Sequence, residues 1–98
     1  QPAIADPTTL FCKALDGTIT ITINEARRTV SMRIIPENRG IENYGPLPAV
    51  FDSEKITYHV ERWGDFTIDR LTVQVSIVTT TGLNMLAWNN CHVVKAQF

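Results

Sequence analysis

The chain has 98 residues, of which 44% are hydrophobic and 19% charged, and its formal net charge is −1. This length limits it to one domain, because a smaller unit buries too little surface to sustain a core. The composition excludes a disordered chain, and the near-neutral charge argues against a nucleic-acid partner, which basic side chains would have to hold. No apolar run approaches the ~20 residues that a membrane-spanning helix needs.

Residues that are branched at Cβ dominate the composition. Threonine, valine and isoleucine contribute 12, 8 and 10 residues, and their stiff side chains favour strands over helices. No window shows a sustained apolar stripe at helical spacing. The sequence therefore predicts an all-β fold.

The N-terminal residues 1–9 are rich in proline and alanine and show no periodicity. We expect them to form a flexible stub, left after removal of a signal peptide. Residues 10–98 are expected to form a single β-barrel domain.

Three strands are expected in the first third of this domain. The first is Leu10–Ala14, followed by a turn signal at Leu15-Asp16-Gly17. Residues Thr18–Ile23 read TITITI, the clearest alternation in the chain, which places the isoleucines on one face. A polar hairpin loop then leads into a third strand at Arg28–Ile34.

Residues 36–52 have no clean period and contain three prolines and two glycines. Proline lacks a backbone donor, which argues against a central strand. We therefore expect a long loop here. Long loops on a rigid scaffold often carry binding residues, although a merely packed connector is an equal alternative.

The rest of the chain alternates again. A strand at Lys55–Arg62 is followed by a two-residue hairpin at Gly64-Asp65. The inward parity then switches from Phe66 and Ile68 to Leu71, Val73, Val75 and Ile77, so a turn or bulge is expected near Arg70. A turn at Thr79–Gly82 and the strands Leu83–Trp88 and Cys91–Phe98 complete the prediction.

These segments make seven or eight short strands in meander order. A meander leaves two open edges, and pairing the last strand with the first removes them. Cys12 and Cys91 lie on those two strands, so we expect a disulfide between them; two buried free thiols are the alternative. The predicted fold is a small antiparallel barrel, or else a sandwich, in an oxidising compartment, either periplasmic or secreted.

Several motifs resemble those of a known group. The pattern F-C-x4-D-G-T-x-T-I-x-I (Phe11 to Ile23), the turn Ala26–Val30, the triplet Ile68–Arg70 and a late cysteine before a terminal phenylalanine are similar to small uncharacterised exported proteins of alphaproteobacteria. The architecture also resembles, more loosely, the periplasmic inhibitors of C-type lysozyme. That resemblance implies the fold and no site residue, because the serines of their inhibitory loop are missing before Tyr44.

Four residues are candidates for binding. Arg39 and Tyr44 lie in the 36–52 segment, and Trp63 and Trp88 lie at strand ends. Aromatic side chains at strand ends either anchor a partner or plug the mouth of a barrel.

Other chemistry has little support in the sequence. His59 and Glu61 share a strand face, but most such pairs are solvated. No serine lies in a nucleophile motif, and no spacing of cysteines and histidines fits a metal site. Asp69-Arg70 is expected to lock a turn. We therefore expect no enzyme activity, no metal and no cofactor.

These observations lead to an exported, non-enzymatic binding module. It is expected to bind another protein, an inhibitor being one such module, through the 36–52 loop and the strand-end aromatic residues. The alternative is an oligomeric or structural envelope protein, because Val78, Leu83, Leu86 and Trp88 cannot all face one core. A carrier of a small apolar ligand is less favoured, since side chains nearly fill so small a barrel.

Overall fold

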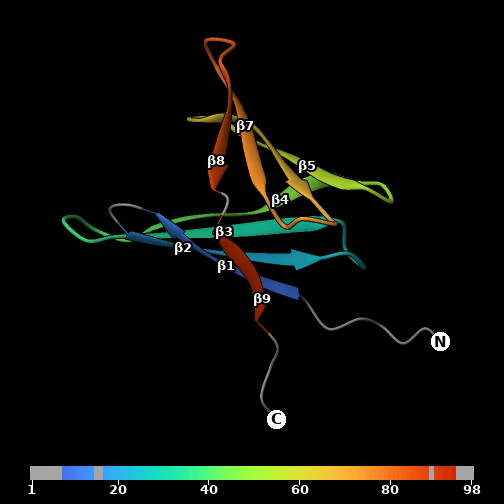
Figure 1. Ribbon diagram of the computed structural model, residues 1–98, viewed down its shortest axis with the longest axis horizontal. Coiled ribbons are helices and arrows are strands. Elements are labelled where there is room, and N and C mark those ends of the chain that lie inside the picture. Colours follow the sequence, from blue (N-terminus) through green and yellow to red (C-terminus); the bar gives the residue numbers. More distant parts are fainter. Residues whose placement is uncertain (1–7, 15–16, 89, 95–98) are drawn as a thin grey trace.

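The computed structural model describes residues 8–14, 17–88 and 90–94, apart from the side chains of Leu86 and Ala87. The described residues form nine strands and no helix (Figure 1). The strands are β1 (Thr8–Ala14), β2 (Gly17–Asn24), β3 (Thr29–Pro36), β4 (Glu42–Phe51), β5 (Lys55–Val60), β6 (Gly64–Asp69), β7 (Val75–Thr79), β8 (Asn84–Trp88) and β9 (Cys91–Val94). Accordingly, this part of the chain contains no helix that could span a membrane.

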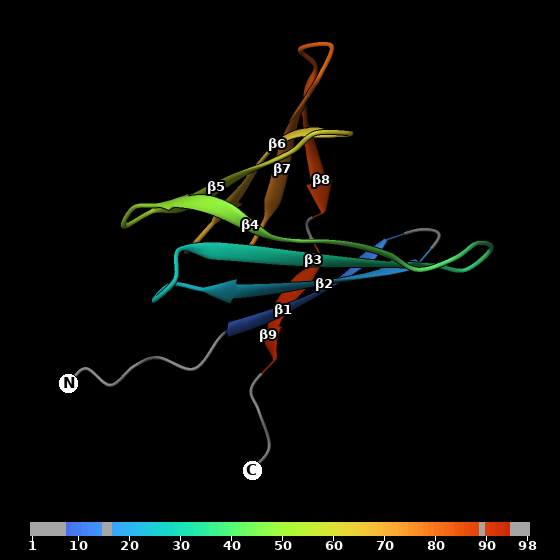
Figure 2. The same ribbon diagram turned by 180° about the vertical axis from the view of Figure 1, so that it is seen from behind.

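All nine strands lie in one antiparallel sheet, in the order β8-β7-β6-β5-β4-β3-β2-β1-β9. The sheet bends at β4, whose first part pairs with β3 and whose last part pairs with β5. The register shifts between Val30 and Met32, beside this bend. As a result, the half of the sheet from β9 to β3 faces the half from β5 to β8 (Figures 1 and 2).

The last two strands bring the two edges of the sheet together. Strand β8 pairs with β7, whereas β9 pairs with β1. Between them, the carbonyl of Asn90 accepts a hydrogen bond from the N–H of Lys13 at 3.1 Å. The sheet is thus a curled half-barrel, and the Cys12–Cys91 disulfide joins its first and last strands. The predicted all-β meander and its disulfide are confirmed.

The core fills the space between the two halves of the sheet. Alternation along β2 and β3 directs Ile19, Ile21 and Ile23, with Val30 and Met32, to the inside, as the sequence predicts. The opposite half contributes buried residues of the same kind: Ile56, Tyr58, Val60, Phe66, Ile68, Val75 and Ile77. Burial of these apolar side chains is the main force that holds the two halves together.

The predicted loop at residues 36–52 is wrong. Residues Glu42–Phe51 form the ten-residue strand β4, Pro36 ends β3, and the irregular residues of the segment are 37–41 and Asp52. Pro46 and Pro48 are tolerated because they lie at the bend, where β4 changes partners, and Pro36 is tolerated because it is the last residue of β3. Gly45 (φ 107°) sits at the same bend, and a Cβ there would lie 2.8 Å from the carbonyl oxygen of Val30. This extra strand is why the described residues form nine strands rather than the seven or eight expected.

Two local predictions also need correction. The expected two-residue hairpin at Gly64-Asp65 is instead a turn over residues 61–63, in which the N–H of Trp63 donates to the carbonyl of Val60 at 2.9 Å. Gly64 opens β6, and its missing Cβ leaves room for the carbonyl oxygen of Val78. Leu71 is 82% exposed rather than inward, because it lies in the turn between β6 and β7.

The chain ends are described only in part. Residues 1–7 of the expected stub lie outside the described residues, but Thr8 and Thr9 already belong to β1. The predicted last strand, Cys91–Phe98, is described as far as Val94.

Candidate functional site

Three of the four predicted binding residues meet at one end of the half-barrel. Glu42, which the sequence did not single out, connects them. The hydroxyl of Tyr44 donates to Glu42 Oε1 at 2.5 Å and accepts from Trp63 Nε1 at 3.2 Å. Arg39 Nη1 lies 3.4 Å from Glu42 Oε2. We call this row of four side chains the Arg39–Trp63 row.

The strands dictate how the row is built. Glu42 and Tyr44 are two residues apart on β4, so both point to the same face of the sheet. Trp63 reaches them from the turn between β5 and β6. Tyr44 and Trp63 are half-buried and pack against the core. They therefore close this end, while Arg39, with 55% of its side chain exposed, faces solvent.

Trp88 does not join this row. Its ring stacks on Phe66 at 5.6 Å, and Phe66 stacks on Tyr58 at 5.3 Å. Burial raises the pKa of Tyr58, and its hydroxyl contacts only Met32 Sδ, at 3.5 Å, among the described groups. Trp88 is thus a half-buried extension of the core.

Both histidines are exposed, as is typical of solvated strand faces. His59 Nδ1 lies 2.6 Å from Asp65 Oδ1 across the β5–β6 ladder, instead of pairing with Glu61. Both side chains are 60% exposed. His92 lies beside the ring of Phe11, with the centroids 5.6 Å apart. Within the described part of the chain, no three metal-ligating side chains come together.

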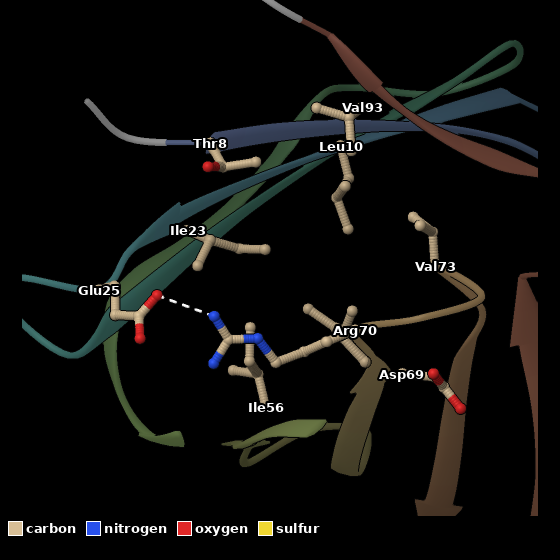
Figure 3. A pocket seen from close by; sticks show the side chains of 10 residues that line it. Thr8, Leu10, Ile23, Glu25, Ile56, Asp69, Arg70, Val73 and Val93 are labelled. Carbon is tan, nitrogen blue, oxygen red and sulfur yellow. Dashed lines mark hydrogen bonds and ion pairs between the residues drawn. The ribbon is translucent and has the colours of Figure 1, made fainter. Parts of the chain in front are cut away.

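The opposite end of the half-barrel contains a cavity of about 140 Å³ that opens to solvent (Figure 3). It lies between the two halves of the sheet. Most of its walls are apolar and come from five strands and one turn: Leu10, Ile23, Ile56, Ile68, Val73 and Val93. An apolar hollow of this kind is where a hydrophobic group would leave water.

A charged bridge crosses the mouth of this cavity (Figure 3). Arg70 Nη2 donates to Glu25 Oε1 at 2.9 Å, and Arg70 Nη1 donates to the carbonyl of Asp52 at 2.8 Å. Arg70 comes from the β6–β7 turn and Glu25 from the β2–β3 turn. The bridge therefore ties the two halves of the sheet together.

Asp69 fixes the turn from which Arg70 extends. Its Oδ1 accepts the N–H groups of Leu71 at 2.8 Å and Thr72 at 3.1 Å. The hydrogen bonds from Thr72 and Leu71 hold the pKa of Asp69 below its usual value. The expected turn lock is correct for Asp69, but Arg70 acts over a distance of 45 residues in sequence.

The sequence did not indicate the cavity. Its walls come from residues whose meeting depends on which strands pair, as Val93 on β9 and Val73 in the β6–β7 turn illustrate. The one sequence feature that relates to the cavity is the change, near Arg70, in which alternate residues are apolar. This change indicates the β6–β7 turn, which lines the cavity.

Comparison with known proteins gives no relative for this chain. No family model matches it, and neither the curated proteins nor the solved structures give a significant match.

Proposed function

We propose that this chain is an exported, non-enzymatic module that binds another protein. The observation that carries this proposal is the Arg39–Trp63 row. The row anchors the short 37–41 loop to the rigid sheet, and the loop presents the exposed side chains of Arg39 and Ile41. A charged and an apolar group held in fixed positions lose little entropy when a partner binds.

Export is supported by the disulfide. Disulfides persist in oxidising compartments and are rare in the cytosol. The periplasm or the extracellular space therefore suits a chain whose first and last strands are joined in this way.

The proposal is tested with paired variants. The double variant Arg39→Glu, Ile41→Asp reverses one charge and replaces one apolar side chain by a charged one. Both positions lie in the loop, so no strand residue is changed. The control, Arg27→Glu with Val50→Asp, makes equivalent changes at exposed positions away from the row. Wild type and both variants are immobilised and exposed to exported proteins of the source organism, and bound proteins are quantified by mass spectrometry.

We expect a partner that wild type and the control retain and that the Arg39–Ile41 variant loses. A partner that all three proteins retain equally would show that the loop is not the binding surface. An unrelated disulfide-bonded domain, immobilised in the same way, serves as the reference. If wild type captures no protein in a larger amount than this reference does, the proposal of protein binding is wrong.

Self-association is a second candidate, because one hairpin exposes apolar residues. Val78, Leu83 and Met85 are 40%, 64% and 52% exposed on the β7–β8 hairpin, which projects from the rest of the sheet in Figures 1 and 2. An exposed apolar hairpin is typical of an interface between subunits. Light scattering at increasing concentration separates a monomer from an oligomer.

A further inference from the structure

The cavity lies where the sheet remains open. Among the described strands, β9 has a neighbour on one side only, which is β1. On its other side, Val93 of β9 faces Val73 of the β6–β7 turn across the cavity (Figure 3). The open edge of β9 and the apolar hollow are therefore parts of one surface.

The register shows which groups of β9 point to the open edge. In an antiparallel pair, residues alternate between those that bond to the neighbouring strand and those whose N–H and C=O point away from it. The hydrogen bond from Lys13 to Asn90 marks the bonded positions. Counting along the register, Cys91 and Val93 direct their backbone groups away from β1. The same residue, Val93, also lines the cavity with its side chain.

The cavity has the size of one apolar side chain. Its volume is about 140 Å³, close to that of the apolar protein cavities of ~150 Å³ that bind benzene. A leucine or phenylalanine side chain fits this volume, whereas a lipid-sized molecule does not. The hollow therefore suits a side chain presented by an extended backbone better than a free lipid.

Charge does not protect this edge. Natural edge strands usually carry charged residues, especially lysine, that prevent further pairing. In this chain no Asp, Glu, Lys or Arg lies between Arg70 and Lys95. Val93 and Val94 on β9 are 46% and 43% exposed. Among the described residues, the edge thus offers unpaired backbone groups on an uncharged strand, beside a cavity whose walls are mostly apolar and whose mouth carries the Arg70–Glu25 bridge.

We propose that the open edge of β9 and the cavity together bind an extended, uncharged peptide segment of a partner protein. The segment adds a strand to the sheet beside β9 and inserts one leucine or phenylalanine side chain into the cavity. Backbone hydrogen bonds to Val93 supply affinity, and the cavity supplies side-chain specificity. This site is separate from the Arg39–Trp63 row, because the two lie at opposite ends of β3.

Synthetic peptides test the proposal directly. The probes are blocked heptapeptides of sequence Thr-Gln-Thr-Xaa-Thr-Gln-Thr, with Xaa as Leu, Phe, Ala or Asp, titrated into the full chain by calorimetry. We expect the Leu and Phe peptides to bind about tenfold tighter than the Ala peptide, because a large apolar side chain is buried. The Asp peptide should not bind. Hydrogen exchange of the Val93 amide should slow when the Leu peptide is present.

Three substitutions at one residue separate the two parts of the site. Val93→Pro removes the edge donor without touching a hydrogen bond to β1, and should abolish binding of every peptide. Val93→Phe keeps the donor but fills the cavity, and should remove the preference for Leu over Ala. Val93→Thr keeps the donor and the shape, and should bind like wild type. Urea unfolding shows that each variant is folded before its binding is interpreted.

Two outcomes would overturn the inference. One is that wild type binds none of the four peptides, and the other is that the Pro and Phe variants bind the Leu peptide as tightly as wild type does. The variant Arg39→Glu, Ile41→Asp should keep peptide binding. This result distinguishes the β9 site from the proposed function at the other end of the molecule, since either one can fail without the other.

Discussion

Cys12 and Cys91 lie directly opposite each other on β1 and β9 and are joined by a disulfide, although they are 79 positions apart in sequence. Strand β9 has only four residues, and three of them are exposed. So short and exposed a strand buries little apolar surface of its own. The disulfide therefore holds β9 in place, and with it the wall of the cavity to which Val93 belongs.

Removing the disulfide should lower stability markedly. A bridge that closes a loop of this length restricts the unfolded chain and contributes roughly 4 kcal/mol in the chain-entropy treatment. That is a large part of the ~5–15 kcal/mol that stabilises a typical domain. We expect the double variant Cys12→Ala, Cys91→Ala to unfold at a clearly lower urea concentration than wild type.

Wild type under reducing conditions provides the matched comparison, and its urea midpoint should coincide with that of the double variant. An unchanged midpoint in both would show that the disulfide does not support the fold, and would also remove the argument for an oxidising compartment.

Gly64 should tolerate no side chain. Its φ is 132°, and a Cβ would overlap the carbonyl oxygen of Val78 on the neighbouring strand. We expect Gly64→Ala to destabilise the protein by more than about 1 kcal/mol. Gly40 is the control, because a Cβ there meets no atom within 4 Å. If thermal unfolding shows equal effects for Gly64→Ala and Gly40→Ala, the close approach of β7 to Gly64 is incorrect.

The hydroxyl of Tyr44 should contribute more to the free energy of unfolding than that of Tyr58. Tyr44→Phe leaves the half-buried N–H of Trp63 without its acceptor and Oε1 of Glu42 without the tyrosine donor, although Glu42 Oε2 keeps its pairing with Arg39, so we expect a loss of about 1 kcal/mol. Tyr58→Phe removes only a weak contact with a sulfur atom, and should cost less than about 0.5 kcal/mol. Urea unfolding of the two variants compares them, and the reverse order would contradict the geometry of the row.

The sequence predicted the features that depend on local pattern. Alternation located β2 and β3, and the inward isoleucines of TITITI are buried as expected. The disulfide was also predictable, because a meander of this length has two ends to join. By contrast, β4 was missed because proline usually marks a loop, and only the pairing with β3 and β5 shows that the prolines lie at a bend.

The candidate site shows the same difference between what local pattern predicts and what depends on strand pairing. Arg39, Tyr44 and Trp63 were each singled out from the sequence, but their connection through Glu42 depends on how the β5–β6 turn meets β4. The cavity depends on the open edge of β9 and on the reach of Arg70 to Glu25. Contacts between residues so far apart in sequence cannot be inferred from periodicity.

Two aspartates in turns, Asp52 and Asp69, should make the stability of the protein depend on pH in acid. Backbone N–H groups of Thr72 and Leu71 lower the pKa of Asp69, and those of Glu54 and Lys55 lower the pKa of Asp52. A lowered pKa means that the unfolded chain binds protons more readily than the folded one. The stabilisation from these carboxylates is therefore complete above their ordinary pKa of 3.8 and is lost as the pH falls through their lower folded values.

We accordingly expect the urea midpoint to be unaffected by these two groups between about pH 7 and 5, and to fall below about pH 4. The double variant Asp52→Asn, Asp69→Asn should show a shallower fall, because amides do not titrate. The double variant Glu37→Gln, Glu61→Gln removes the same number of exposed charges, and should keep the wild-type profile in acid. An aspartate variant that falls as steeply as wild type would show that the two turns do not bind their carboxylates in the ionised form.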